Sequence, residues 1–415
     1  MMQASAAPVQ PVILGADIGV YALARAFHAQ YAVKSIVVSG AVLGPIANSK
    51  IIDNRVVADG HDPRQLVDEL LAVADQHAGA PLLLLANSDW LVRQVVEHRD
   101  ELAPHYHLPF LSSELLDLLS DKASFTEVAR RHGIPVPGTV VQDFGVPATQ
   151  WVRADVPFDF PVIAKAASSA DYQEVEFPGK AKVFEIGSQA ELDDLWARLR
   201  AAGYAGKFVV QDLIPGDDTG MRSITAYVDS HGKATLLCSA HVLLEEHTPS
   251  GLGNPAAMFT TEIPQILEPA RRMLEAIGYR GFANFDVKLD PRDGQYRFFE
   301  VNPRIGRNNY YVTAAGANPA RFVVEDLVNR QAVEPVTVTN QVLYSIVPVR
   351  LLLRYIVDPQ LRSTVSSLAR SGHVARPLWY RADRSFKRGR YVGLALINQV
   401  RKFRRHYPQV STTGF

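Results

Sequence analysis

Oxygen-bearing side chains gather in residues 282–311, which read FANFDVKLDPRDGQYRFFEVNPRIGRNNYY. A turn-forming run in the middle predicts two strands joined as a hairpin. Side chains alternate along a strand, so Phe298, Glu300 and Asn302 are expected on one face of the second strand. Strand pairing then brings Asp286 beside Glu300 and Asn302. Carboxylate and amide oxygens suit Mg²⁺ or Mn²⁺, and so few protein ligands leave coordination positions for phosphate oxygens.

A solvent-facing hairpin that happens to be acidic is the simpler interpretation of these carboxylates. The flanking residues are too apolar for a fully exposed ribbon, and Arg304, Arg307, Asn308 and Asn309 follow directly. Cations beside carboxylates and a metal favour a site that transfers phosphate.

The first hundred residues predict a parallel sheet covered by helices. Residues 11–19 (PVILGADIG) are typical of a buried strand that runs into a glycine turn. The further strands and helices alternate along the chain: strands at 35–38 and 81–85, helices at 20–31, 63–77 and 88–98. Ligands of such sheets lie at the carboxyl ends of the strands, where Asp17 and the loop 87–89 fall. The full dinucleotide fingerprint is missing, so we expect no nicotinamide cofactor.

The next part of the chain predicts a mixed α+β region. One helix is expected to begin near Ser113 and to continue through Lys122, until the prolines of residues 134–138 end it. We place the first domain boundary just before this helix. Short apolar strands and one helix follow: strands at 160–164, 182–185, 208–211, 223–228 and 235–239, and the helix at 189–202.

The run FFEVNPR at residues 298–304, after the acidic strand position Asp286, resembles the metal-binding signature of ATP-grasp ligases. The resemblance covers residues 115–326. It implies an α/β protein in which two α+β subdomains grip ATP, preceded by a parallel-sheet α/β domain. The domains it implies are 1–114, the preceding domain; 115–335, the ATP-grasp domain; and 336–415, a basic C-terminal extension.

The same resemblance implies the contacts to ATP. Lys122 (in SDKASF) and Lys165 (in FPVIAKA) match the two lysines that contact phosphate. Residues 211–216 (QDLIPG) resemble the hinge that contacts adenine, and Asp217 or Asp218 would hold the ribose. The hinge residues implied are Gln211, Asp212, Leu213 and Ile214. Two departures are Gln211 and Asp286, at positions where many members have glutamate.

The activity implied is activation of a carboxylate as an acyl phosphate, followed by attack of an amine to form an amide. Asp286, Glu300 and Asn302 would hold the metal, and Arg304, together with Lys165, would stabilise the transferring phosphoryl group. The residues expected to face the substrates are Asp17, Arg307, Asn309, Glu245 and His247.

Several stretches also resemble D-aspartate ligases and related carboxylate-amine ligases of Gram-positive cell-wall synthesis. They are GADIGVYALARAFH at 15–28, IPGDD at 214–218, EEHTP at 245–249 and RNNYYVTAAG at 307–316. This resemblance implies that D-aspartate is the activated acid. It also implies that the amine belongs to a nucleotide-linked peptidoglycan precursor.

His247 follows Glu245 and Glu246, and a histidine beside carboxylates can bind a metal or transfer protons. A loop that closes over substrate, or that simply caps the fold, is the alternative, with Gly251 and Gly253 as flexible points. Glu245 or His247 is our hypothesis for the group that accepts the proton of the incoming amine.

The amino-acid composition limits the class of protein that these residues can belong to. With 415 residues, 47% hydrophobic and 21% charged, the chain is typical of a globular protein of two or three domains. No secretion signal follows Met1, and no run of about 20 apolar residues could cross a bilayer. The lone Cys238 fits a reducing compartment. We therefore expect a cytoplasmic protein.

Residues 351–415 are strongly basic, with 13 Lys or Arg against Asp358 and Asp383. Within residues 381–407, apolar side chains recur at helical spacing, the pattern of a basic amphipathic helix. Such a helix could hold an anionic substrate, lie on an anionic membrane, or pack its apolar face on the enzyme.

Three other functions remain open at the level of sequence. A relative of carbamoyl-phosphate synthase would activate bicarbonate instead of an amino acid. A scaffold that has lost catalysis would not be expected to keep Asp286, Glu300, Asn302 and both lysines. A nucleic-acid-binding module would bind through its basic tail in a salt-dependent way. We expect no nucleic-acid partner.

Overall fold

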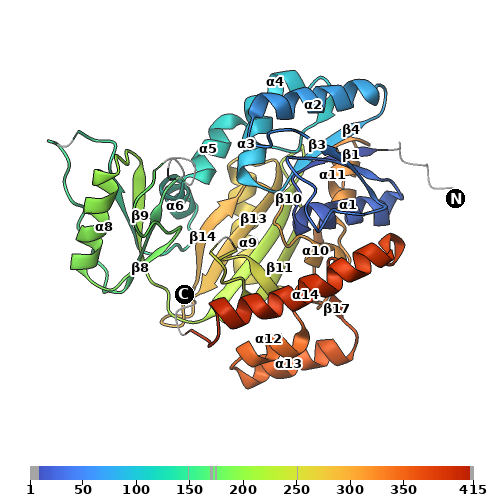
Figure 1. The fold of residues 1–415 in the computed structure, drawn as a ribbon. Coiled ribbons are helices and arrows are strands. Elements are labelled where there is room, and N and C mark those ends of the chain that lie inside the picture. The colour runs from blue at the N-terminus through green and yellow to red at the C-terminus, as the bar shows by residue number, and fades with distance from the viewer. Residues whose placement is uncertain (1–8, 148, 169–171, 173–174, 250, 412–415) are drawn as a thin grey trace.

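The computed structural model describes residues 9–147, 149–168, 172, 175–249 and 251–411. The described strands form three sheets, of five, eight and four strands. Figure 1 shows the four-stranded sheet with α8 as a lobe on one side of the eight-stranded sheet, and the five-stranded sheet on the other.

The five-stranded sheet is parallel throughout, in the order β3-β2-β1-β4-β5. Its elements are β1 (Gln10–Leu14), α1 (Ile18–Tyr31), β2 (Ser35–Ser39), β3 (Ile52–Val56), α2 (Pro63–Gln76), β4 (Leu82–Ala86), α3 (Asp89–Glu97), α4 (Arg99–Leu102) and β5 (Tyr106–His107). The predicted parallel sheet is thus confirmed. The sequence IDNRV of β3 has no apolar alternation, which is why that strand was not predicted.

The eight-stranded sheet is mainly antiparallel and runs β14-β13-β10-β11-β12-β16-β17, with β15 paired to β11. Its elements are β10 (Met221–Val228), β11 (Ala234–Glu245), β12 (Pro255–Thr260), α9 (Pro264–Ala276), β13 (Gly281–Leu289), β14 (Tyr296–Asn302), α10 (Tyr310–Ala314), α11 (Pro319–Leu327), β15 (Val336–Thr337), β16 (Leu343–Ser345) and β17 (Val374–Ala375). Strands β16 and β17 show that residues beyond 335 extend this sheet.

The four-stranded sheet runs β6-β9-β7-β8 and is antiparallel. Its elements are β6 (Thr139–Asp143), β7 (Val162–Ala166), β8 (Phe184–Ile186), α8 (Gln189–Ala201) and β9 (Lys207–Asp212). It has its own aromatic core, in which Trp196 and Phe208 pack edge to face. The connection back to the eight-stranded sheet passes through the short helix η1 (Asp218–Gly220).

The single helix predicted to run from Ser113 through Lys122 is instead two helices, α5 (Ser113–Ser120) and α6 (Lys122–Arg131). Asp121 separates them because its backbone is extended and its carboxylate accepts a hydrogen bond from the backbone N–H of Ser124 at 2.8 Å. An Asp in this conformation is a strong N-cap, so the chain restarts as a new helix at Lys122.

The predicted basic C-terminal helix is confirmed as α14 (Phe386–His406). It follows α12 (Val349–Tyr355), α13 (Pro359–Arg370) and the short helix η2 (Arg381–Asp383), and it crosses the lower part of the molecule in Figure 1. Val392 and Phe403 are buried, so one face of the helix packs on the protein. Among the described residues, no helix is both long and apolar enough to cross a bilayer.

Candidate active site

The acidic hairpin forms as predicted, but a β-bulge changes which side chains share a face. Asp286 pairs with Glu300, and after the bulge Val287 pairs with Phe298, which leaves Phe299 as the extra residue. Phe298 is buried against Phe285 with the rings edge to face. The prediction that Phe298 shares a face with Glu300 was therefore wrong, because strict alternation does not continue through a bulge.

Asp286, Glu300 and Asn302 do come together. The Nδ2 atom of Asn302 donates to Oδ2 of Asp286 at 3.2 Å, and Glu300 is the cross-strand neighbour of Asp286. Burial, and then the charge of Glu300, raise the pKa of Asp286 well above its usual range. Asp286 has no ion-pair partner within 4 Å in the described part of the chain.

These residues fit a divalent cation. Two half-buried carboxylates with one amide form a hard oxygen set whose excess negative charge a cation would neutralise. In the parts of the chain that the structure describes, no group of three or more His, Cys, Asp or Glu side chains could hold a metal ion. A metal here would therefore need oxygens from the nucleotide and water to complete its coordination.

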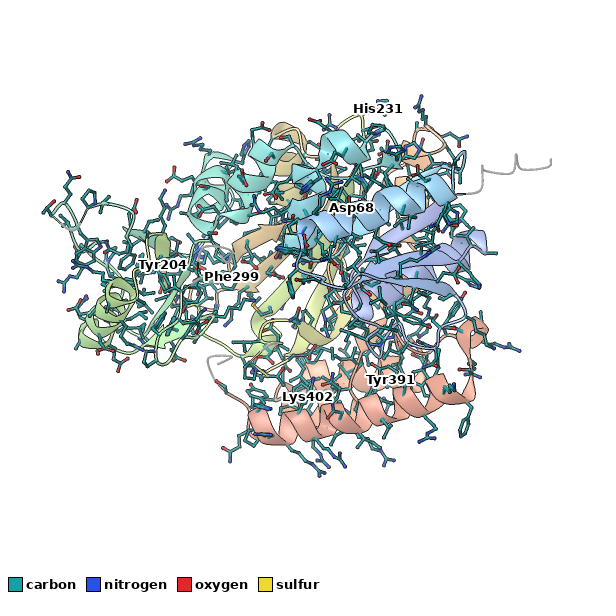
Figure 2. All side chains as sticks on the ribbon, turned by 45° about the horizontal axis from the view of Figure 1, so that its top comes forward. Asp68, Tyr204, His231, Phe299, Tyr391 and Lys402 are labelled. Carbon is teal, nitrogen blue, oxygen red and sulfur yellow. The ribbon has the colours of Figure 1, made fainter. Side chains whose placement is uncertain are left out.

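Two lysines lie near the carboxylates, Lys122 at the start of α6 and Lys165 on β7 of the neighbouring lobe. Nζ of Lys122 lies 3.5 Å from Oε2 of Glu300, and its backbone N–H donates to the carbonyl of Ala167 just after β7. Lys165 is half-buried on β7, with Nζ 5.7 Å from the ring centre of Phe299. Figure 2 shows Phe299 where this lobe meets the eight-stranded sheet.

The charges of these groups depend on one another. Burial lowers the pKa of Lys165 to about 8, and Lys122 and Lys182 lower it too, whereas Glu300 opposes them. Burial alone would raise the pKa of Glu300, but Lys122 and Lys165 lower it below its usual range. Glu300 is thus held as a carboxylate among cations, which is the charge arrangement a phosphate-transfer site needs.

Arg304 connects the hairpin to the parallel sheet. Its Nε donates to Oδ1 of Asp89 at 2.7 Å, and its Nη2 donates to Oδ1 of Asn302 at 3.2 Å. Asp89 is the first residue of α3, at the carboxyl edge of the sheet where ligand-binding loops were expected. The role of Asp89 was not predicted, because nothing in one sequence pairs a loop carboxylate with an arginine 215 positions away.

Arg307 lies between two carboxylates. Its Nη1 donates to Oε1 of Glu246 at 2.5 Å, and its Nε lies 3.2 Å from Oδ2 of Asp17. The other oxygen of Asp17 caps α1, accepting hydrogen bonds from the backbone N–H groups of Gly19 and Val20. Glu246 was not predicted as a partner of Arg307, although its position beside Glu245 was noted.

Asn309 does not lie open to a ligand. It is fully buried, and its Nδ2 donates to the carbonyl oxygens of Gly19 at 3.1 Å and Gly306 at 2.9 Å. These contacts fix the loop that carries Arg307 against the start of α1. The contacts observed for Asn309 are therefore structural, and a substrate contact by this residue stays a prediction.

The predicted hinge, residues 211–216, begins with the last two residues of β9. Gln211 is buried and donates to the hydroxyl of Thr139 at 3.1 Å, while Asp212 forms a two-point ion pair with Arg292 at 2.6 and 3.1 Å. Leu213 is half-buried and Ile214 is buried. The carbonyl of Ile214 accepts a hydrogen bond from Nζ of Lys288 at 2.9 Å, so a buried cation holds the hinge backbone.

Asp218 joins the hinge to the end of β11. Its Oδ2 accepts hydrogen bonds from the backbone N–H of Glu245 at 2.8 Å and from Nε2 of His247 at 2.9 Å. The ring of His247 also stacks on Tyr407, with ring centres 3.5 Å apart. Burial, followed by the charge of Asp218, raises the pKa of Glu245. These contacts favour the interpretation of His247 as part of a cap.

Comparison with known proteins agrees with this geometry. Residues 219–316 match the family "Carbamoyl-phosphate synthase L chain, ATP binding domain". The chain is 33% identical to a D-aspartate ligase of Enterococcus faecium over 405 residues, which cover 96% of both chains. It is 26% identical to a D-alanine--D-alanine ligase of Carboxydothermus hydrogenoformans over 242 residues, 54% of this chain and 72% of that one.

The fold also has solved relatives. The biotin carboxylase domain of a Hydrogenobacter thermophilus 2-oxoglutarate carboxylase, solved with MgADP and bicarbonate, superposes with a TM-score of 0.58. That match has 14% sequence identity and covers 79% of this chain and 71% of the other, so it shows the fold alone. Since the match to the D-aspartate ligase runs almost end to end, this chain belongs to the D-aspartate ligase family of ATP-grasp carboxylate-amine ligases.

Proposed function

We propose that this enzyme uses ATP to activate D-aspartate and joins it to an amine of a peptidoglycan precursor. The observation that carries the proposal is the 33% identity to a D-aspartate ligase across 96% of both chains. Both the predicted metal-site and phosphate-site residues lie within this shared length. We also propose that the reaction takes place in the cytoplasm, where ATP is available.

In the first step, a carboxylate oxygen of the amino acid attacks the γ-phosphorus of ATP, and the bond from that phosphorus to ADP breaks. We assign neutralisation of the phosphate oxygens to Lys122 and Lys165, which supply positive charge at the carboxylate pair. Asp286, Glu300 and Asn302 would hold Mg²⁺ or Mn²⁺, which when bound would neutralise charge on the phosphates. Arg304 is held by Asp89 and Asn302 and is the proposed stabiliser of the transferring group.

In the second step, the amine nitrogen attacks the acyl carbon, phosphate leaves, and the amine loses a proton. We propose Arg307 as the group that faces the carboxylate substrate, since Glu246 and Asp17 hold its guanidinium in a fixed position. Glu245 is the better candidate for accepting the proton, because Nε2 of His247 is bonded to Asp218 and its ring is stacked on Tyr407.

We assign nucleotide binding to the hinge and its neighbours. Adenine would lie against the backbone from Gln211 to Ile214, a segment held by Lys288 and by the Asp212–Arg292 ion pair. For the ribose we propose Asp218, whose buried Oδ1 has no hydrogen-bond partner in the described residues.

Bicarbonate is the competing acid, since the family matched by residues 219–316 is named for carbamoyl-phosphate synthase. Release of phosphate from ATP, measured with D-aspartate, L-aspartate, other D-amino acids and bicarbonate, separates these substrates. Glu300→Gln is the inactive variant, and Glu262→Gln, at an exposed position outside the site, is its matched control. Release that requires bicarbonate and ignores every amino acid would overturn the proposal.

A further inference from the structure

We propose that the outward side of α14 docks this enzyme on an anionic membrane surface. We call this surface the outer face of α14 and define it by three apolar residues, Phe386, Leu394 and Ile397, and five cations, Lys387, Arg390, Arg401, Arg404 and Arg405. The inference does not depend on which amino acid the enzyme activates.

The apolar residues of the outer face are open to solvent. Phe386 is 81% exposed, Leu394 61% and Ile397 52%. With Arg390 between Phe386 and Leu394, and Arg401 after Ile397, the spacing along the chain is four, four, three and four residues. Residues three or four apart lie on the same side of a helix, so these side chains form one continuous stripe.

The helix cannot rotate to bury this stripe, because its opposite side is already fixed in the protein. Arg388 is buried, forms an ion pair with Asp383 at 3.0 Å, and donates to the carbonyl oxygens of Pro45 and Ala47. At the other end, Phe403 is buried and packs near the ring of Tyr355. The stripe is therefore held on the surface by both ends of the helix.

The charge of the outer face is entirely positive. Helix α14 contains no Asp or Glu, and its five outer cations are exposed. None of the five has an ion-pair partner within 4 Å in the part of the chain that the structure describes. Figure 2 shows nitrogen-tipped side chains projecting from α14 away from the rest of the protein, on the helix that carries Tyr391 and Lys402.

A loop beside the helix adds apolar surface. Val42 and Leu43 are 43% and 52% exposed, and the next residue, Gly44, packs so closely on Tyr391 that a Cβ atom there would collide with the ring. The two exposed side chains thus lie in a segment in contact with α14.

An anionic bilayer matches both properties of this surface. Lys and Arg are attracted to acidic lipid headgroups, and Phe, Leu and Ile insert at the boundary of the acyl chains. A nucleic acid would match the cations but offers no apolar phase for the stripe. The combination of exposed apolar residues with unpaired cations on one side of a fixed helix therefore favours a lipid surface.

Vesicle co-sedimentation of the full chain tests the proposal. We expect binding to vesicles of phosphatidylglycerol and phosphatidylcholine, weakened by salt, and little binding to phosphatidylcholine alone. Phe386→Ser/Leu394→Ser/Ile397→Ser should weaken binding by about tenfold or more, and Arg401→Gln/Arg404→Gln/Arg405→Gln by about 100-fold. The matched control Val56→Ser/Val152→Ser, which removes two exposed apolar side chains from other surfaces, should bind like the natural chain.

Each other outcome contradicts the proposal. Equal binding to both kinds of vesicle would exclude a role for the positive charge. A serine variant that binds like the natural chain would exclude a role for the apolar stripe. Lipid-free self-association that the serine variant abolishes, measured by light scattering, would assign the outer face to a second copy instead. Because ATP turnover in lipid-free solution should be unchanged in all variants, a failure here is separate from a failure of the proposed reaction.

Discussion

The ammonium of Lys122 lies 3.5 Å from the carboxylate of Glu300, although the two residues are far apart in the chain. Lys122 begins α6, and Glu300 lies on β14 of the eight-stranded sheet. The contact places a proposed phosphate ligand next to a proposed metal ligand. Each group neutralises the other, and phosphate and metal would replace these contacts on binding.

Replacement of Lys122 by methionine should impair ATP use more than folding. The uncharged side chain keeps much of the apolar length but leaves phosphate oxygens and Glu300 without a cation. We expect kcat/KM for ATP to fall by about 100-fold, similar to the loss of one strong electrostatic contact. Steady-state kinetics with Lys34→Met, which removes an exposed surface lysine, provides the control. Unchanged kinetics in the Lys122 variant would exclude it from phosphate binding.

The charge of Lys165 should make ATP binding depend on pH. Burial lowers the pKa of this lysine to about 8, so its positive charge is present below that pH and is lost as the pH rises through it. We therefore expect KM for ATP to rise as the pH passes about 8. Lys165→Arg should remove this rise, because a guanidinium stays protonated.

A pH-dependent change in the stability contributed by Lys165 cannot explain the rise in KM for ATP. An unfolded lysine keeps its proton up to about pH 10.4, so between the two pKa values the unfolded state binds more protons. The contribution of Lys165 to the free energy of unfolding therefore increases with pH, opposite to the expected loss of ATP affinity. Parallel loss of stability and affinity above about pH 8 would contradict the assignment to Lys165.

Replacement of Arg304 by lysine should impair catalysis. Its guanidinium contacts Asp89 and Asn302 from two different nitrogens, a geometry that a single ammonium cannot reproduce. We expect Arg304→Lys to lower kcat by about 10- to 100-fold with a smaller change in KM for ATP. Asp89→Asn should show a weaker version of the same defect. If Arg304→Lys changes only KM, the residue binds substrate and does not stabilise the transferring group.

The acidic hairpin was predictable because its signals are local. A turn run, alternating side chains and the FFEVNPR stretch all lie within thirty consecutive residues. The bulge at Phe299 was not predictable, since it depends on packing Phe298 against Phe285 in the core. The bulge nevertheless leaves Asp286 paired across the strands with Glu300, as predicted.

Contacts between residues far apart in the chain could not be predicted from one sequence. Asp89 and Arg304 are 215 positions apart, and His247 stacks on Tyr407 from the last helix. Asp121, by contrast, carried a usable local signal, because it is an N-cap residue type followed by the helix-forming run KASFTEVARR. That signal becomes clear only once the preceding helix is seen to end at Ser120. The sequence therefore predicted the fold class and the acidic residues better than the network that orients them.

His247 should matter for nucleotide binding and stability, and not for proton transfer. His247→Phe can keep the ring against Tyr407 but removes one of the two hydrogen bonds to the buried Oδ2 of Asp218. We expect the free energy of unfolding to fall by about 1–2 kcal/mol and KM for ATP to rise. Denaturant titration and kinetics measure both. A loss of amide formation with normal stability and normal KM would instead make His247 the proton acceptor.

We propose that this chain activates D-aspartate at the site built around Glu300. The most direct test is ADP and phosphate release from ATP and Mg²⁺ with D-aspartate and a peptidoglycan precursor that carries a free amine, together with mass analysis of the product. We expect release that depends on D-aspartate, a product heavier by one aspartyl group, and loss of both in Glu300→Gln. Release stimulated equally by L-aspartate or only by bicarbonate, or a fully active Glu300→Gln enzyme, would contradict this proposal.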